Sequence, residues 1–292
     1  MNKKLGSSLL LVLTAFIWGC AFVAQREGLD YAGPLTFNGS RSIIGALVLV
    51  PVSLIFKPKT PVNDRHTWLG GIFCGLAIFA ATNMQQAGLA YTEVGKAGFI
   101  TTFYIVLVPV LGLFLRKKTG LFTWVAVALA LCGLYFLCMT PGGFTVQKGD
   151  ILELSCALFY ALQILIVDRF VADADGVKMS CIQFAVSGVL SLIAAFLFEE
   201  PNFRQLWQGW LPLLYAGVLS SGVAYTLQIV GQKNLHPTVA SLLMSLESAF
   251  AVLAGWAILK ERLSGRELLG CGLMLCAVVL VQIAPAKEAK ND

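Results

Sequence analysis

The residue best suited to chemistry by its type and position is Glu247, a carboxylate in the middle of an apolar run. The run extends over residues 240–255 and contains no other charged residue. A carboxylate at the centre of a membrane-spanning helix is costly unless it faces a cavity or a partner, so it marks a candidate functional site. We expect Glu247 to couple transport to protons or to bind a cationic substrate group; the alternative is a packing role with neighbouring hydroxyls.

Polar and aromatic residues recur at helical spacing in other apolar segments. In one of them Glu153, Cys156, Tyr160 and Gln163 share a face, because residues three or four apart do so in a helix. Such stripes predict an aqueous cavity with aromatic walls or hydrogen bonds between packed helices; their recurrence on four helices favours the cavity. The candidate substrate-binding residues are Trp18, Asn83, Gln86, Thr101, Tyr104, Tyr160, Gln163, Tyr225, Gln228 and Glu247, with Thr82 and Gln85 as an alternative to Asn83 and Gln86.

Arg41 is a second charged residue inside an apolar run, about seven residues from its start. From there it can extend outward to lipid headgroups or pair with Glu27 or Asp30. This interfacial position is the favoured interpretation, and recognition of a substrate carboxylate is the alternative.

The composition places the chain in a lipid bilayer. It is 58% hydrophobic and only 13% charged, whereas soluble domains are about 25% charged. The net charge of +5 comes from basic residues at the ends of apolar runs, as membrane topology requires, and implies no nucleic-acid partner. The eight cysteines lie in apolar runs without metal-binding spacing, so we expect no metal site and no cofactor.

The elements that must position these residues are about ten apolar runs, each near the roughly 20 residues that cross a bilayer. They divide five and five, which predicts an all-α polytopic membrane protein. We expect a first repeat at residues 1–140, a connector at 141–149, a second repeat at 150–286 and a cytoplasmic tail at 287–292. The runs are 5–25, 34–56, 68–90, 95–115, 121–140, 151–167, 177–198, 210–230, 237–259 and 267–284.

The two halves align at a nearly constant spacing. Trp18 matches Tyr160 at 142 residues, and Tyr104 matches Glu247 at 143. A repeat with an odd number of spans enters the bilayer from opposite sides in its two copies, which is the inverted-repeat plan of secondary transporters. Lys and Arg gather in alternate loops, and this predicts a plasma-membrane protein with both termini cytoplasmic. Since one chain supplies both repeats, a monomer suffices.

Catalytic motifs are absent from the sequence. It has no His-Glu-x-x-His, no Gly-rich phosphate-binding loop and no Gly-x-Ser-x-Gly, and only two histidines. We therefore do not expect an enzyme.

Three segments resemble the EamA-type branch of the drug/metabolite transporter superfamily: residues 17–22, 88–98 and 237–264. The resemblance implies ten helices in two inverted five-helix repeats, with both termini cytoplasmic. It also implies a central cavity lined by the first, third, fourth, sixth, eighth and ninth helices. Relatives move amino acids, purines, amines and other metabolites.

The sequence departs from the family pattern at two places. Ser248 stands where the family usually has proline after the central glutamate, which leaves open whether the ninth helix is broken; Pro109 is retained in the first half. Residues 116–118, Arg-Lys-Lys, replace a glutamate. We expect an alternating-access exporter of small organic metabolites, with proton coupling through Glu247. The alternatives are an uncoupled facilitator or channel and, less favoured, a lipid-modifying enzyme or scramblase.

Overall fold

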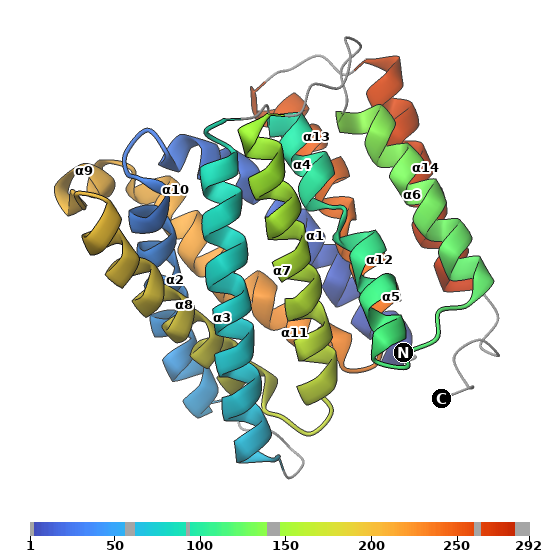
Figure 1. Ribbon diagram of the computed structural model, residues 1–292, viewed down its shortest axis with the longest axis horizontal. Coiled ribbons are helices and arrows are strands. Elements are labelled where there is room, and N and C mark those ends of the chain that lie inside the picture. Colours follow the sequence, from blue (N-terminus) through green and yellow to red (C-terminus); the bar gives the residue numbers. More distant parts are fainter. Residues whose placement is uncertain (1–2, 56–61, 92–93, 139–146, 260–263, 284–292) are drawn as a thin grey trace.

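The computed structural model describes residues 3–55, 62–91, 94–138, 147–259 and 264–283. In this part of the chain every regular element is a helix, and the long helices run side by side in one bundle (Figure 1). The elements are α1 (Lys3–Gly28), α2 (Pro34–Ile55), α3 (Asp64–Gly88), α4 (Val94–Thr101), α5 (Tyr104–Phe114), α6 (Leu121–Cys138), α7 (Lys148–Phe170), α8 (Gly176–Phe198), α9 (Phe203–Gln208), α10 (Trp210–Leu214), η1 (Tyr215–Ala224), α11 (Tyr225–Gln232), α12 (Pro237–Met244), α13 (Leu246–Leu259) and α14 (Gly265–Ile283).

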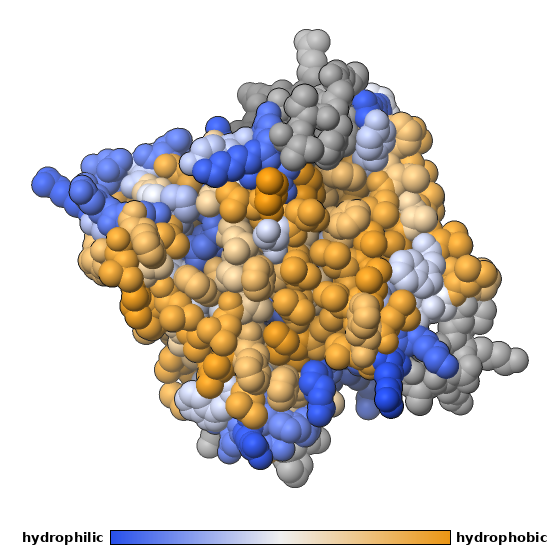
Figure 2. Space-filling model, in the orientation of Figure 1, coloured by the Kyte–Doolittle hydropathy of each residue, from blue (hydrophilic) through white to orange (hydrophobic). Residues whose placement is uncertain are grey.

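The lengths and composition of the helices match a bilayer. Within the described ranges nine helical stretches are long and apolar enough to cross it, and α6 adds a shorter apolar helix. Three of the nine combine consecutive elements: α4 with α5, α10 with η1 and α11, and α12 with α13. The visible face is apolar across its middle and polar toward its two ends (Figure 2). The expected fold class, an all-helical multi-pass membrane protein, is confirmed.

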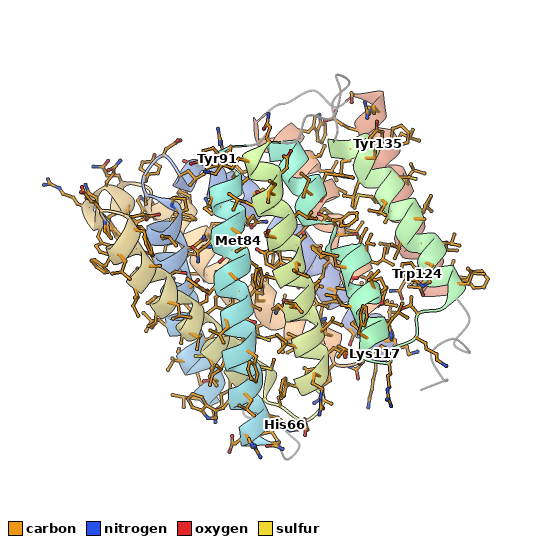
Figure 3. The ribbon with its side chains drawn as sticks, viewed as in Figure 1. His66, Met84, Tyr91, Lys117, Trp124 and Tyr135 are labelled. Atoms are coloured by element: carbon orange, nitrogen blue, oxygen red, sulfur yellow. The ribbon has the colours of Figure 1, made fainter. Side chains whose placement is uncertain are left out.

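Helices of the two halves pack in a symmetric pattern. The second span, α2, packs against its counterpart α8, and the fifth, α6, packs against its counterpart α14 (Figure 1). Likewise α3 packs against α7, and the equivalent pair in the other half is η1 and α11 against α1. The two ends of the bundle are called here the Tyr91 end and the His66 end, after residues labelled in Figure 3. This pairing is what two inverted five-helix repeats produce.

Two spans are interrupted at equivalent positions. The fourth span is broken at Thr102 and Phe103, between α4 and α5, and the ninth at Ser245, between α12 and α13. At each break a hydroxyl donates to a backbone carbonyl about one turn earlier: Thr102 to Gly98, at 2.7 Å, and Ser245 to Leu242, at 2.8 Å. Such bonds compete with the helix ladder and bend it. The ninth span is therefore broken without the family's proline.

The eighth span departs from the regular α-helix that the apolar run predicts. Its central ten residues, η1, form a π-helix, a rare geometry that occurs mostly at functional sites. Two hydrogen bonds join this span to α1: the Tyr215 hydroxyl of η1 donates to the Ile17 carbonyl at 3.1 Å, and the Thr14 hydroxyl of α1 donates to the Ala224 carbonyl at 3.2 Å. The π-helix thus lies against the helix that carries Trp18.

Candidate functional site

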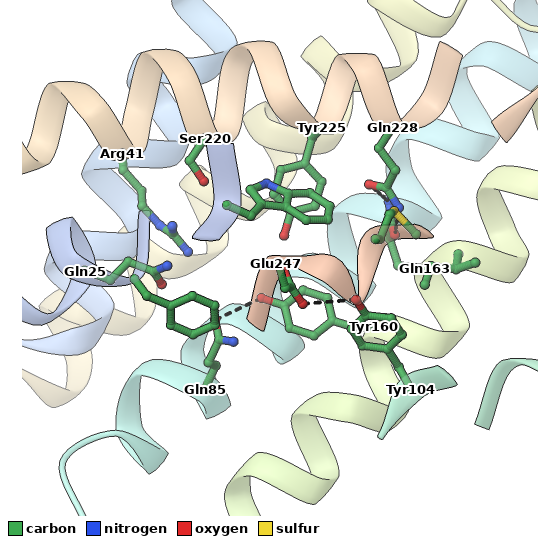
Figure 4. Close-up of a pocket in the computed structure, with 14 residues that line it drawn as sticks. Gln25, Arg41, Gln85, Tyr104, Tyr160, Gln163, Ser220, Tyr225, Gln228 and Glu247 are labelled. Carbon is green, nitrogen blue, oxygen red and sulfur yellow. Dashed lines mark hydrogen bonds between the residues drawn. The ribbon is translucent and has the colours of Figure 1, made fainter. Parts of the chain in front are cut away.

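A cavity lies at the centre of the bundle, where the two interrupted spans meet the eighth. Figure 4 shows Gln25 and Arg41 toward one end of it, Gln163 and Gln228 toward the other, and Glu247 between. The lining residues are Trp18, Phe22, Gln25, Arg41, Gln85, Tyr104, Tyr160, Gln163, Ile164, Ser220, Tyr225, Gln228, Met244 and Glu247. They come from all six helices that the family resemblance implies and from the second helix, α2, as well.

The cavity contains very little free space. Its free volume is about 40 Å³, enough for a few water molecules at roughly 10–15 Å³ each. An organic metabolite needs several times this room. The side chains therefore have to move apart before a cargo of that size can enter.

Glu247 lies at the start of α13, directly after the break at Ser245. It is 7% exposed and accepts a hydrogen bond from the Tyr104 hydroxyl at 3.0 Å. Tyr104 is the first residue of α5, so the partner also follows a break. The neighbouring residues Thr102 and Ser248 share a further hydrogen bond of 3.0 Å. The two interruptions are thus joined to each other beside the carboxylate.

Gly19 brings α1 close to this carboxylate. A Cβ atom at Gly19 would lie 2.6 Å from the Phe250 Cβ and 2.8 Å from the Glu247 carbonyl oxygen. No side chain fits between backbones at that distance, so a glycine is required. The close approach holds Trp18, the preceding residue, over the cavity.

Arg41 corrects the favoured interpretation from the sequence. Its side chain does not extend to the headgroups or pair with Glu27 or Asp30: it is 4% exposed and lines the cavity. In the part of the chain that the structure describes it forms no ion pair, and its Nε has no hydrogen-bond partner. A buried guanidinium without a carboxylate is energetically costly, and it is suited to binding an anionic group in a bidentate manner.

Aromatic rings form one wall of the cavity. The Trp18 and Tyr225 rings lie 4.5 Å apart between centroids, and Phe184 packs on Tyr225 at 5.0 Å. The Tyr160 hydroxyl donates to Gln85 Oε1 at 3.1 Å. Trp18 Nε1 is buried without a hydrogen-bond partner. This wall offers flat apolar surface together with a free N–H donor, which suits an amphipathic metabolite.

A pair of glutamine side chains, Gln163 and Gln228, lies at the end of the cavity away from Arg41 (Figure 4). Gln228 Nε2 donates to Gln163 Oε1 at 2.9 Å, and Gln163 Nε2 donates weakly to Gln228 Oε1 at 3.4 Å and to Gln183 Oε1 at 3.1 Å. All three side chains are at most 1% exposed. Their helices, α7, α8 and α11, are therefore tied together at this point.

The predicted site residues fall into two groups. Seven line the cavity: Trp18, Tyr104, Tyr160, Gln163, Tyr225, Gln228 and Glu247. Their role in substrate binding stays a prediction. Asn83, Gln86 and Thr101 do not line it; they bond to other helices instead, Asn83 to Ser191, Gln86 to the Gln25 carbonyl and Thr101 to Glu153.

In the third span the alternative pair, Thr82 and Gln85, predicted the cavity better than Asn83 and Gln86, because Gln85 lines it. Arg41 was also missed as a site residue, although a signal was present. Asn38, Arg41, Ser42 and Gly45 are spaced by three and four residues, and all are buried on one face of α2. This stripe of small and polar residues indicates which face of α2 points inward. The distance of Arg41 from the start of the helix carries no such information.

Comparisons with known proteins agree with this architecture. The model of the EamA-like transporter family matches residues 5–139 and 147–283. This chain belongs to the EamA-like transporter family. A transporter of Archaeoglobus fulgidus, described as uncharacterized, is 32% identical over 96% of this chain and 87% of its own length. The similarly described inner membrane transporter YedA of Escherichia coli (strain K12) is 26% identical, over 93% of this chain and 90% of its own.

A solved crystal structure shares the fold of this EamA family member. It superimposes with a TM-score of 0.78 and covers 98% of this chain and 99% of its own, at 17% sequence identity. At that identity the likeness concerns the fold alone. The family, the multi-pass membrane architecture and transport as the kind of activity are thus established by the family match and by relatives that are named transporters.

Proposed function

We propose that this EamA-family transporter exports amino-acid-like metabolites that carry both a carboxylate and an amine. The observation that carries the proposal is that Arg41 and Glu247 line one cavity while Arg41 has no acidic partner among the described residues. The guanidinium would bind the cargo carboxylate, and the Glu247 carboxylate would bind the ammonium group. Purines and simple amines, the other cargo classes of the family, leave Arg41 without a partner.

Alternating access supplies the transport cycle. The two matched breaks at Thr102 and Ser245 lie beside the cavity and join the repeats, so they suit the bending that opens one side and then the other. We place the protein in the plasma membrane with both termini cytoplasmic, as a monomer that moves its cargo outward. In this cycle Glu247 couples transport to protons, because its carboxylate binds either a proton or the cargo ammonium group and exchanges one for the other.

An uncoupled facilitator is the competing function. The small free volume of the cavity, about 40 Å³, favours a carrier over an open channel, because a channel needs a continuous pathway wide enough for its cargo. A carrier shows counterflow, in which unlabelled cargo on one side accelerates entry of labelled cargo from the other.

The test uses purified protein in liposomes and a panel of radiolabelled amino acids, with labelled purines and amines as the other classes. We expect saturable amino-acid flux with counterflow and a rate that depends on pH. Glu247→Gln should lose both the flux and its pH dependence, whereas Glu27→Gln, a carboxylate outside the cavity, should retain them. Uptake of purines alone would contradict the cargo class, and flux at full rate in Glu247→Gln would contradict the coupling role.

A further inference from the structure

A second buried carboxyl group, Glu153, lies in the membrane-spanning part of the protein and outside the cavity. It belongs to α7 and precedes the cavity residue Tyr160 by seven positions, which is roughly 10 Å along a helix. The first turn of α7 is at the Tyr91 end, where Lys148 lies over the Tyr91 ring at 5.3 Å. Glu153 therefore lies between the cavity and that end of the bundle.

The side chain of Glu153 is fully buried, and only one of its oxygens is hydrogen-bonded. Oε2 accepts from the Thr101 hydroxyl at 2.6 Å, whereas Oε1 has no partner. The wall beside Oε1 is the backbone of α3: a Cβ atom on Gly88 would lie 2.6 Å from this oxygen. The carboxyl group therefore packs directly against the α3 backbone at this point.

The groups around Glu153 provide no compensating positive charge within the described residues. On its own helix Asp150 lies one turn before it and the Cys156 thiol one turn after it. α4 contributes the Thr101 hydroxyl, and α3 contributes the backbone at Gly88. Lys96 also belongs to α4, and its side chain lies outside the described residues. Among the described groups an ionised Glu153 would thus have a single hydrogen bond and no counter-charge, an arrangement that is strongly disfavoured in a protein interior.

Glu153 is connected to the same helix break as Glu247. Thr101, the last residue of α4, donates to Glu153, and Tyr104, the first residue of α5, donates to Glu247. The residue before the break is therefore hydrogen-bonded to one carboxyl group, and the residue after the break to the other. A movement of α4 away from α7 would break the bond to Glu153 and admit water to it.

We propose that Glu153 is a second proton-binding site: it holds a proton while α4 is packed against α7, as in this structure, and releases it when α4 separates from α7. On release the carboxyl O–H bond breaks and the proton passes to water entering between the two helices from the Tyr91 end. The carboxylate that remains is then hydrated. Opening toward that end is thereby linked to the loss of one proton, independently of the cargo bound between Arg41 and Glu247.

The test is infrared spectroscopy of the purified protein at neutral pH, which separates the C=O band of a protonated carboxyl group from the bands of a carboxylate. We expect the wild-type spectrum to contain a protonated-carboxyl band that Glu153→Gln lacks and that Glu247→Gln retains. Glutamine keeps the acceptor for Thr101, so the fold should persist. If the wild type minus Glu153→Gln difference instead shows only carboxylate bands, Glu153 is ionised and the proposal is wrong.

Substitutions of Thr101 provide a second test, in which Glu153 itself is unchanged. Thr101→Val removes the hydrogen-bond donor and should shift the frequency of the Glu153 band, whereas Thr101→Ser keeps the donor and should leave it unchanged. A band that is insensitive to both substitutions does not arise from Glu153 in this contact and would overturn the assignment. Neither measurement needs a transported cargo, so its outcome is independent of the proposed transport function.

Discussion

The Tyr104 hydroxyl donates a hydrogen bond to Glu247 Oε1 at 3.0 Å, and the two residues occupy equivalent positions in the two repeats, 143 residues apart. Each follows a helix break, so the inverted repeat brings its two unlike central residues into direct contact. A symmetric frame thus produces an asymmetric pair, a phenol and a carboxylate, at the axis that relates the halves.

Substitution of Tyr104 and substitution of Glu247 should have different effects, the first on stability and the second on transport. Tyr104→Phe removes the donor and leaves a buried carboxylate unsatisfied, which costs about 1–3 kcal/mol; we expect a lower Tm in detergent. Glu247→Gln keeps an acceptor for the hydroxyl, so Tm should change little while flux is lost. Thermal unfolding of both variants, monitored by intrinsic fluorescence, checks this. A Tm loss in Glu247→Gln as large as in Tyr104→Phe would show that the carboxylate serves the fold.

Substitution of Arg41 should weaken cargo binding. Charge-assisted hydrogen bonds contribute about 1.5–3 kcal/mol, so Arg41→Gln should raise the Kd for a zwitterionic amino acid by roughly ten- to a hundredfold. Arg41→Lys keeps the charge and loses the bidentate geometry, and should fall between. Arg26→Gln is the control, since Arg26 lies on the exposed end of α1. Titration calorimetry gives each Kd; equal affinity in Arg41→Gln and wild type would exclude the guanidinium from the site.

Gly19→Ala should destabilise the contact between α1 and α13. The added Cβ would be 2.8 Å from the backbone nitrogen of Ala251, and overpacking of this kind costs about 1–3 kcal/mol. The control is Gly272→Ala on α14, where a Cβ meets nothing within 4 Å and alanine should be neutral or mildly stabilising in a helix. Thermal unfolding of the two variants compares them directly. Equal Tm values for both would mean that the helices are not this close.

The amide pair should show energetic coupling. Gln163→Leu leaves the buried Gln228 amide without its partner, and so does the reverse substitution, whereas the double variant removes both. Interhelical hydrogen bonds in membranes average about 0.6 kcal/mol and reach about 1.7, so a double-mutant cycle should give a coupling in that range. Gln282 and Ser8, which bond at 3.0 Å in a more exposed place, provide the comparison and should couple less. Additive effects at Gln163 and Gln228 would contradict the hydrogen bond.

Much of the fold could be predicted from the sequence because its signals are local. The length of each apolar run sets a span, and the constant spacing between Trp18 and Tyr160, or Tyr104 and Glu247, reveals the repeat. These four residues all line the cavity. Helical stripes on α7 and α11 were sufficient to place Tyr160, Gln163, Tyr225 and Gln228.

Features that depend on packing between helices could not be predicted. The rotation of α2 about its axis decides that Arg41 points inward, and that rotation is set by contacts with α8 and η1. Along α3 a shift of one residue separates Gln85, which reaches the cavity, from Gln86, which bonds to α1. The breaks at Thr102 and Ser245 involve hydroxyl hydrogen bonds to the backbone and no proline. The sequence therefore contains no residue that predicts them.

The central claim is that cargo binds between Arg41 and Glu247, and a thermal-shift comparison of matched ligands tests it most directly. The amino acid that stabilises the purified protein most is compared with its amide, which lacks the carboxylate, and with its hydroxy acid, which lacks the amine. A ligand at a hundred times its Kd stabilises the folded state by about 2.7 kcal/mol. The account predicts that only the zwitterion raises Tm, and that Arg41→Gln and Glu247→Gln abolish the rise. An amide that raises Tm as much as the amino acid, in wild type and in Arg41→Gln alike, would contradict it.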